Sequence, residues 1–224
     1  MDGGTTLSTT ALTPPGSPWS IKAIGDFNDD LRYDLAWQNA FDNSAGMWLM
    51  DGATVLERKT IMPPGTQWTV ASAADLDFDG MADLLWKNSD GSVGAWRMNG
   101  TTVVERRTLM GPGTGWSLTM VGGLTYTQPH FLSWTYTDGT VGIWDMDGVN
   151  VRNRKTEMGP GTGWHLTDMG FGDGTGGALA WTHDSRAVGM WWMAYLTVNQ
   201  RKTELPAGTT YTVITHDART FVAP

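Results

Sequence analysis

The chain has no cysteine among its 224 residues, which excludes disulfide bonds, thiol catalysis and thiolate metal sites. No apolar run approaches the ~18 uncharged residues that suggest a membrane-spanning helix. No stretch combines capping residues with a 3.6-residue apolar period over the length of a helix. These absences leave an all-β protein with no membrane span as the expectation.

Positive charge is also scarce, with 15 Lys and Arg against 23 Asp and Glu, a net charge of −8. Affinity for nucleic acid rests mostly on contacts of Lys and Arg with phosphates, so we expect no nucleic-acid partner. The first ten residues, MDGGTTLSTT, lack the basic start and apolar segment of a signal peptide.

Tryptophan, in contrast, is abundant, and it recurs at a fixed interval. Trp19, Trp68, Trp116 and Trp164 are spaced by 49, 48 and 48 residues, and Tyr211 follows 47 residues later. Each of these aromatics follows a Pro/Gly-rich turn such as PPGTQ or GPGTG. Self-similarity at 20–50 residues is typical of solenoids, propellers and arrays. We therefore expect one supersecondary unit that is used repeatedly.

The second copy shows what this unit is. Residues 68–115 contain four short runs, TVASAADL, ADLLW, VGAWRM and TVVERRTLM, bounded by Gly, Asp, Asn and Pro. Such runs predict β-strands. Asp-Gly or Asn-Gly pairs between the third and fourth runs predict two-residue hairpin turns. Four antiparallel strands in about 48 residues predict one blade of a β-propeller.

The predicted fold is thus a single all-β propeller domain over residues 1–224. Complete copies span 19–67, 68–115, 116–163 and 164–210. Residues 1–18 align with a fourth strand, and residues 211–224 supply a first strand and a short second one. We expect both termini to close a fifth blade, although that blade has no third strand. A short blade, a fragment of a larger protein, or a blade shared with another chain in an oligomer are the alternatives.

Carboxylates gather between the first and second strands of the first two copies. They follow the pattern D-x-[DN]-x-D-x-x-x-D at Asp26, Asn28, Asp30 and Asp34, and again at Asp75, Asp77, Asp79 and Asp83. Calcium takes six to eight oxygen ligands, and alternate residues of a tight loop point inward. Position 12, which is Glu in an EF-hand, is Trp37 or Trp86 here. A calcium site is predicted, with solvated acidic turns as the alternative.

This loop, placed before a strand ending in DLLW, resembles the FG-GAP/VCBS repeats of integrin-like β-propellers. The resemblance implies structural Ca²⁺ bound by the eight side chains named above, and by the main-chain carbonyls of Arg32 and Met81. Copy one departs from the family at Asp29 and Leu31, where Gly is favoured. Copies three and four have lost the pattern and keep only Asp173.

The opposite rim of the ring is predicted to carry two tryptophans per copy. The pairs are Trp19 with Trp37, Trp68 with Trp86, Trp116 with Trp134, and Trp164 with Trp181. Polar residues such as Asn39 and Asn88 follow the second member. Aromatic rings beside amides and hydroxyls favour a saccharide site, while blade-to-blade packing is the alternative. The strand-three tryptophans, Trp48, Trp96, Trp144 and Trp191, are expected in the core.

The recurring Arg/Lys-Thr triplets of the fourth strand are interpreted as cations that protect an edge strand from aggregation. Enzyme chemistry finds no support, because the four histidines occupy unrelated repeat positions and no catalytic motif is present. We predict a non-enzymatic, multivalent, lectin-like module that binds glycans, with a protein-interaction or adhesion module as the alternative. A secreted, extracellular location is expected.

Overall fold

The computed structural model describes residues 10–123, 131–171 and 176–208. These ranges contain sixteen β-strands and no helix. No helix that could cross a membrane is therefore found within them. The all-β prediction is confirmed.

The strands form four sheets of four antiparallel strands, each in up-and-down order. Blade 1 consists of β1 (Trp19–Gly25), β2 (Asp34–Asn39), β3 (Ala45–Asp51) and β4 (Thr54–Met62). Blade 2 consists of β5 (Trp68–Ala74), β6 (Asp83–Asn88), β7 (Val93–Asn99) and β8 (Thr102–Met110). Blade 3 consists of β9 (Trp116–Gly122), β10 (Phe131–Tyr136), β11 (Val141–Asp147) and β12 (Asn150–Met158). Blade 4 consists of β13 (Trp164–Phe171), β14 (Gly177–His183), β15 (Val188–Ala194) and β16 (Thr197–Leu205).

The predicted hairpins between the third and fourth strands have the expected backbone. Gly52, Gly100 and Gly148 have φ values of 58°, 56° and 55°. A two-residue hairpin turn requires this left-handed conformation, which glycine adopts without a steric cost. In the fourth copy Tyr195 occupies the same position with φ 56°.

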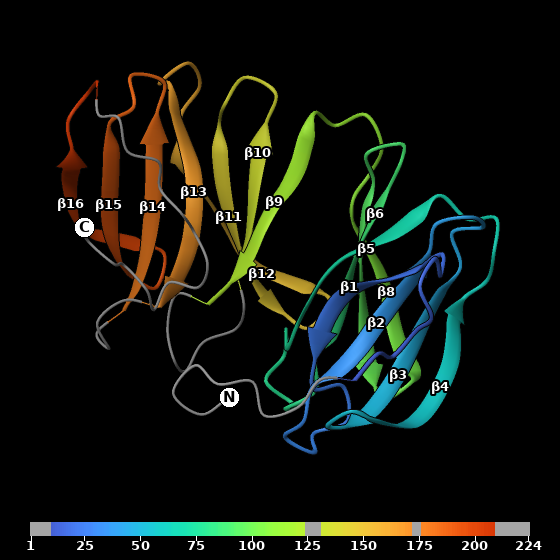
Figure 1. Cartoon of the computed structure of the whole chain (residues 1–224). Helices are drawn as coiled ribbons and strands as arrows, with labels where there is room; N and C mark the ends of the chain where they lie inside the picture. The colour runs from blue at the N-terminus through green and yellow to red at the C-terminus, as the bar shows by residue number, and fades with distance from the viewer. Residues whose placement is uncertain (1–9, 124–130, 172–175, 209–224) are drawn as a thin grey trace.

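The blades lie side by side in chain order, with the innermost strands β1, β5, β9 and β13 in succession. Figure 1 shows blade 1 in blue and blade 4 in orange and red at opposite ends of this row. The prediction of a five-bladed closed ring is not supported, because the described residues form four blades in an open row. Residues 1–9 and 209–224, on which the fifth blade depended, lie outside the described residues.

Each blade carries the same stack of side chains on one of its faces. The β2 tryptophan of blade 1, Trp37, contacts Trp48 of β3, and Arg58 of β4 covers the Trp48 ring at 4.2 Å. The equivalent stacks are Trp86–Trp96–Arg106, Trp134–Trp144–Arg154 and Trp181–Trp191–Arg201. We call the face with this stack the front of the blade and the opposite face its back.

The core is formed where the front of one blade packs on the back of the preceding one. Between blades 1 and 2, Trp86 and Trp96 of the front meet Ala45 and Met47 of the back. The same arrangement joins blade 2 to blade 3 and blade 3 to blade 4. Between blades 1 and 2 the back residues that meet the indoles include the small Ala45 and the unbranched Met47, whereas the back of blade 3 uses Val141 and Ile143.

A buried amide adds polar contacts between blades 1 and 2. Gln38 is 2% exposed, its Nε2 donates to the Trp68 carbonyl at 2.8 Å, and its Oε1 accepts from Val70 N at 2.8 Å. Asn43 donates from Nδ2 to the same Trp68 carbonyl at 3.1 Å. The Gln38 side chain therefore forms with the backbone of β5 the two kinds of hydrogen bond that a neighbouring strand would form: it donates to a carbonyl and accepts from an N–H group.

We predict that Gln38→Leu lowers the free energy of unfolding by about 1–3 kcal/mol, because Val70 N–H is left buried without an acceptor. The control is Lys87→Leu at the equivalent, exposed position of blade 2, where a change within about 0.5 kcal/mol is expected. Urea unfolding measures both. Equal effects of the two substitutions would contradict the role assigned to Gln38.

Candidate binding groove and carboxylate loops

The two predicted rims lie at opposite ends of the strands. At one end, Gly25 pairs with Asp34, and the carboxylate loop joins them. At the other end, each leading tryptophan is paired across the ladder with the last residue of the second strand. These pairs are Trp19 with Asn39, Trp68 with Asn88, Trp116 with Tyr136, and Trp164 with His183.

Asn39 and Asn88 have a local structural role at this rim. Asn39 Oδ1 accepts a hydrogen bond from Phe41 N at 2.8 Å, and Asn88 Oδ1 accepts one from Asp90 N at 3.1 Å. Both oxygens therefore fix the turn that follows their strand. Neither residue lines the groove described below.

The second tryptophan of each predicted pair is buried, which corrects the prediction that it contacts a ligand. Trp37 is 4% exposed, and Trp86, Trp134 and Trp181 are 0% exposed. Each ring lies 4.4–4.7 Å from the tryptophan of the neighbouring strand, centroid to centroid. A ring with no surface in contact with solvent cannot stack on a sugar, so these four residues belong to the core.

The leading tryptophans are only half-buried, and each lies over a glycine of the third strand. A Cβ atom at Gly142 would meet the Trp116 ring at 3.7 Å, and one at Gly189 would meet the Trp164 ring at 3.3 Å. Gly46 and Gly94 have the same relation to Trp19 and Trp68. Because glycine has no side chain, the indole can approach the third strand closely at this position.

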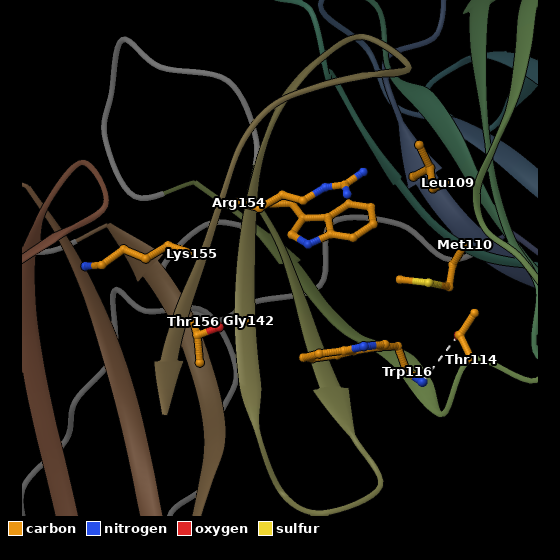
Figure 2. A pocket seen from close by; sticks show the side chains of 9 residues that line it. Leu109, Met110, Thr114, Trp116, Gly142, Arg154, Lys155 and Thr156 are labelled. Carbon is orange, nitrogen blue, oxygen red and sulfur yellow. Dashed lines mark hydrogen bonds between the residues drawn. The ribbon is translucent and has the colours of Figure 1, made fainter. Parts of the chain in front are cut away.

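One of these tryptophans lines a groove of about 620 Å³ between blades 2 and 3 (Figure 2). Its lining comes from the end of β8, the following turn, and the front of blade 3. The residues are Leu109, Met110, Thr114, Trp116, Gly142, Trp144, Arg154, Lys155 and Thr156. The groove therefore combines two indoles with the Arg154 guanidinium and two hydroxyls, whereas the Lys155 side chain points away from it (Figure 2), toward the Leu196 carbonyl of blade 4.

The arginine in this groove is held in place by its neighbour. The Arg154 guanidinium lies 4.1 Å from the centroid of the Trp144 ring, on β11 directly opposite Arg154. The sequence interpretation of Arg/Lys-Thr as edge protection missed this stack. The signal was present, because the arginine stands opposite the strand-three tryptophan in every copy.

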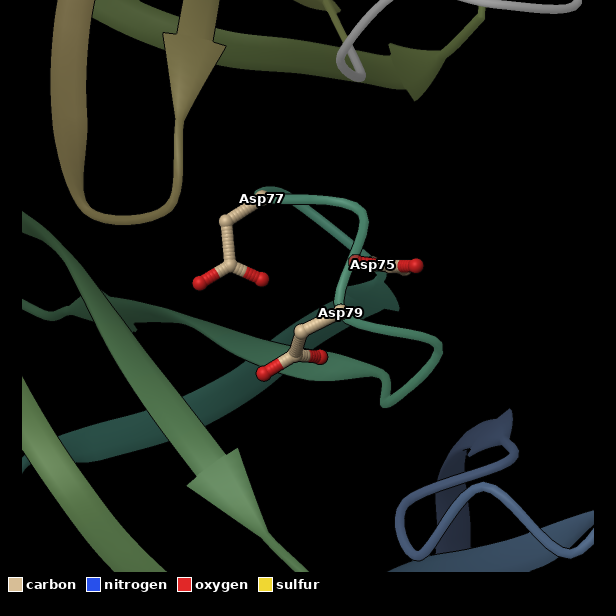
Figure 3. A group of neighbouring side chains, drawn as sticks. All are labelled: Asp75, Asp77 and Asp79. Atoms are coloured by element: carbon tan, nitrogen blue, oxygen red, sulfur yellow. The ribbon is translucent and has the colours of Figure 1, made fainter.

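At the other end of blade 2, the second carboxylate loop brings three acids together. Asp75, Asp77 and Asp79 each offer an oxygen within 4.8 Å of the others. Figure 3 shows the three side chains on the same loop. The fourth predicted ligand, Asp83, is outside this group. Its two oxygens accept hydrogen bonds from Leu76 N at 3.2 Å and Met98 N at 2.9 Å.

The first loop repeats this design in part. Asp34 accepts from Phe27 N at 2.9 Å and from Met50 N at 2.8 Å, as Asp83 does one blade later. Asp26 accepts from the backbone N–H groups of Asn28, Asp30 and Leu31. Asp30 Oδ1 accepts from Arg32 N at 2.9 Å, so the loop is folded by its own acids.

At the third position of both loops, a buried side-chain oxygen has no hydrogen-bond partner among the described residues. These oxygens are Asn28 Oδ1 and Asp77 Oδ1. A buried oxygen without a donor is costly, and a cation would remove that cost. The structure thus places an unmet oxygen at the same position of the two loops.

The sixth position of the loops adopts a left-handed backbone in both copies. Gly80 has φ 88°, whereas Leu31 has φ 65° and is 91% exposed. A leucine in this conformation carries a steric cost that glycine avoids. The leucine that replaces the glycine favoured by the family therefore strains the backbone at residue 31, but the loop keeps the left-handed conformation at this position.

The loops also connect successive blades through their backbones. The Asp26 carbonyl accepts from Ala82 N at 2.5 Å, and the Phe27 carbonyl accepts from Gly100 N at 2.6 Å. One blade later, the Leu76 carbonyl accepts from Gly148 N at 2.8 Å. The side chains of Phe27 and Leu76 are fully buried. Each carboxylate loop is therefore part of a blade–blade interface.

Burial and mutual repulsion make these carboxyls hard to ionise. Burial raises the pKa of Asp83 to about 7, against the opposing effect of the hydrogen bond from Met98 N. Burial also raises the pKa of Asp34. For Asp77 the pKa is raised by burial and then by the charges of Asp79 and Asp75.

Residues 26–86, which include both loops, match the family model of the FG-GAP-like repeat. This region is an FG-GAP-like repeat. The resemblance predicted from the carboxylate pattern is confirmed over that range. No curated protein matches the chain.

Several solved structures are similar at low identity. A protein of unknown function from Bacteroides caccae has a TM-score of 0.46 at 11% identity, covering 83% of this chain and 61% of that one. The WD40 domain of SCAP from fission yeast has 0.46 at 11%, covering 83% and 46%. The C-terminal WD40 domain of Sif2 has 0.36 at 13%, covering 76% and 54%. The chain thus spans between 46% and 61% of the length of these structures.

The raised pKa of Asp83 predicts a pH dependence of stability in the metal-free protein. Because the folded state holds this proton up to about pH 7 and the unfolded chain only to about pH 4, stability is lost as the pH rises between these values. Unfolding in the presence of a chelator at pH 4.5 and pH 8 measures this loss, which is up to about 4 kcal/mol for a shift of this size. Asp83→Asn should remove that component, and parallel pH profiles for the two proteins would contradict the assignment.

Proposed function

We propose that the protein is a non-enzymatic, multivalent carbohydrate-binding module whose FG-GAP-like loops hold structural calcium. The observation that carries the proposal is the groove at Trp116. Its half-buried indole lies close to Gly142, with the hydroxyls of Thr114 and Thr156 and the guanidinium of Arg154 lining the same groove. An aromatic ring stacks on the apolar face of a sugar, while polar groups around it bind the sugar hydroxyls.

The repeat supplies the same chemistry more than once. Trp68 lies over Gly94 in blade 2 and Trp164 over Gly189 in blade 4, each with a stacked arginine on the same sheet. Several weak sites on one rigid scaffold raise the overall affinity for a surface that displays many copies of a sugar. The repetition of this arrangement supports the multivalent binding that we propose.

We propose calcium at the two loops because their residues fit a hard cation. The second loop offers oxygens from Asp75, Asp77 and Asp79, and both loops leave a buried third-position oxygen without a partner. Bound Ca²⁺ would add two positive charges to a group of three acids beside which the Arg97 guanidinium lies 3.9 Å from Asp77. We further propose an extracellular location, where millimolar calcium fills sites of modest affinity.

The first prediction concerns the groove. Trp116→Ala should weaken binding to an immobilised glycan at least about tenfold, the equivalent of 1.4 kcal/mol, because it removes the stacking surface. Replacing Trp68, Trp116 and Trp164 together should weaken it further, because avidity is lost. A glycan array followed by calorimetry on the best ligand measures both.

Phe41→Ala is the matched control, because Phe41 is an aromatic residue that is 86% exposed on the same rim and outside the groove. Binding should survive this substitution. Circular dichroism establishes that each variant is folded. Loss of binding in the control, with binding retained by Trp116→Ala, would contradict the proposed site.

The second prediction concerns the metal. Calcium at a hundred times its dissociation constant should stabilise the fold by about 2.7 kcal/mol, which raises the melting temperature by several degrees. The increase should be larger at pH 8 than at pH 5, because protons compete with calcium for Asp77, whose pKa is raised by burial and by the charges of Asp79 and Asp75. Asp79→Asn should reduce the increase to the part contributed by the first loop, without changing the melting temperature in a chelator. A melting temperature indifferent to calcium at pH 8 would reject both loops as metal sites.

A protein-interaction module is the second candidate, and one observation favours it. Leu31, Tyr33 and Phe78 are 91%, 74% and 47% exposed on or beside the carboxylate loops. Exposed apolar side chains in one region are typical of protein contacts. A chain that ignores every glycan but captures a partner through these residues would replace the first proposal by this one.

A further inference from the structure

One position on the front of the blades is buried in three copies and exposed in the first. Ile21 on β1 is 43% exposed. Its equivalents in blades 2, 3 and 4 are Val70, Leu118 and Leu166, which are 6%, 4% and 7% exposed. These three pack within the clusters that join each blade to the preceding one. Ile21 is therefore an apolar residue at a position that packs against the preceding blade in the other three copies, but no blade precedes blade 1 among the described residues.

Two neighbours of Ile21 show the same difference. Ile24 is 55% exposed, whereas its equivalent Ala73 packs into the cluster between blades 1 and 2. Tyr33 is 74% exposed, whereas its equivalent Ala82 is 6% exposed and donates its backbone N–H to blade 1. The inner part of the front of blade 1 is thus an uncovered apolar surface.

Part of this front is already covered. Leu12 packs against the cluster of Leu35, Trp37 and Met50 in blade 1. In the repeat Leu12 corresponds to Leu109, which ends the fourth strand of blade 2. The segment before β1 therefore takes the place that the end of a preceding blade takes elsewhere, and leaves β1 itself uncovered.

The back of blade 4 shows the complementary difference. On the backs of blades 1, 2 and 3, Met47, Ala95 and Ile143 are 0% exposed beneath the next blade. Their equivalent in blade 4 is Met190, which is only half-buried. Two unlike surfaces are therefore uncovered among the described residues, at opposite ends of the row of blades (Figure 1). One is the front of blade 1, which no preceding blade covers, and the other is the back of blade 4, which no following blade covers.

We infer that the back of blade 4 of one copy of this chain docks on the front of blade 1 of a second copy. The contact continues an interface that the chain already uses between each pair of successive blades. Because the two surfaces differ, the association is head-to-tail, and repetition of the contact either closes a ring or extends a filament. The incoming blade takes over the position that Leu12 holds.

The polar contacts between successive blades indicate how such docking is aligned. Arg107 on the back of blade 2 donates to Asn150 of blade 3, and Lys155 on the back of blade 3 donates to the Leu196 carbonyl of blade 4. The equivalent cation of blade 4 is Lys202, which contacts only Glu204 among the described residues, at 3.0 Å. Lys202 is therefore placed to donate to the carbonyl of Ala53, the counterpart of Leu196, in the second copy.

The test uses two substitutions that each block one surface. Ile21→Lys blocks the front of blade 1, and Met190→Lys blocks the back of blade 4. Size-exclusion chromatography with light scattering should find the wild-type chain as an oligomer and each variant as a monomer. An equimolar mixture of the two variants should form a 1:1 dimer, because each retains the surface that the other has lost.

Phe41→Lys is the control, since it adds the same charge at an exposed position away from both surfaces, and it should assemble like the wild type. Circular dichroism establishes folding, and Ile24→Lys replaces Ile21→Lys if the latter is unfolded. A wild-type monomer throughout the micromolar range, or a mixture that stays monomeric, would overturn the inference. Glycan binding by a monomer would leave the proposed function intact, so the two ideas fail separately.

Discussion

Every blade of this protein has a front that it cannot bury by itself. The two indoles and the arginine of each stack lie on one side of a four-stranded sheet. In blades 2, 3 and 4 the back of the preceding blade covers the strand-two indole, and in blade 1 Leu12 packs against the cluster that contains it. Burying a large aromatic side chain is worth on the order of 1.5–3 kcal/mol, so leaving a whole front in water is costly. The order of the blades and the uncovered surfaces at the two ends follow from this requirement.

The carboxylate loops serve the same requirement at one rim. Asp34 and Asp83 accept backbone N–H groups from the loop and from the third strand, which holds the loop against its own blade. The loop carbonyls in turn accept N–H groups from the next blade. The acids are therefore part of blade stacking even before a metal is considered, and a calcium ion would reinforce an existing connection.

Much of the fold was predictable because it depends on turn residues and on a repeat period that can be read directly from the sequence. The Asp-Gly and Asn-Gly pairs predict hairpins, and the 48-residue period predicts repeated sheets. The FG-GAP-like loops were predicted from the spacing of four polar residues, which needs no knowledge of distant contacts. The distinction between Trp116 and Trp134 could not be predicted in this way. Both are strand tryptophans beside polar residues, and the burial of Trp134 depends on contacts with Leu85 and Ala95 of blade 2, which are distant in the sequence.

The number of blades also depends on contacts that no local pattern contains. Ile21 and Val70 occupy the same repeat position, and their exposure differs only because one has a preceding blade. The role of Arg154 was missed for a related reason, since its partner Trp144 lies on the adjacent strand and the pairing depends on the strand register.

The most direct test of this account is to compare one blade with the whole chain. A peptide of residues 68–115 contains all four strands of blade 2, with its hairpins and its carboxylate loop. Near-ultraviolet circular dichroism reports whether its tryptophans are fixed in an asymmetric environment. The account predicts no such signal from the peptide and a strong one from the whole chain, lost in a cooperative transition. A peptide that shows the tryptophan signal of a folded blade would contradict it.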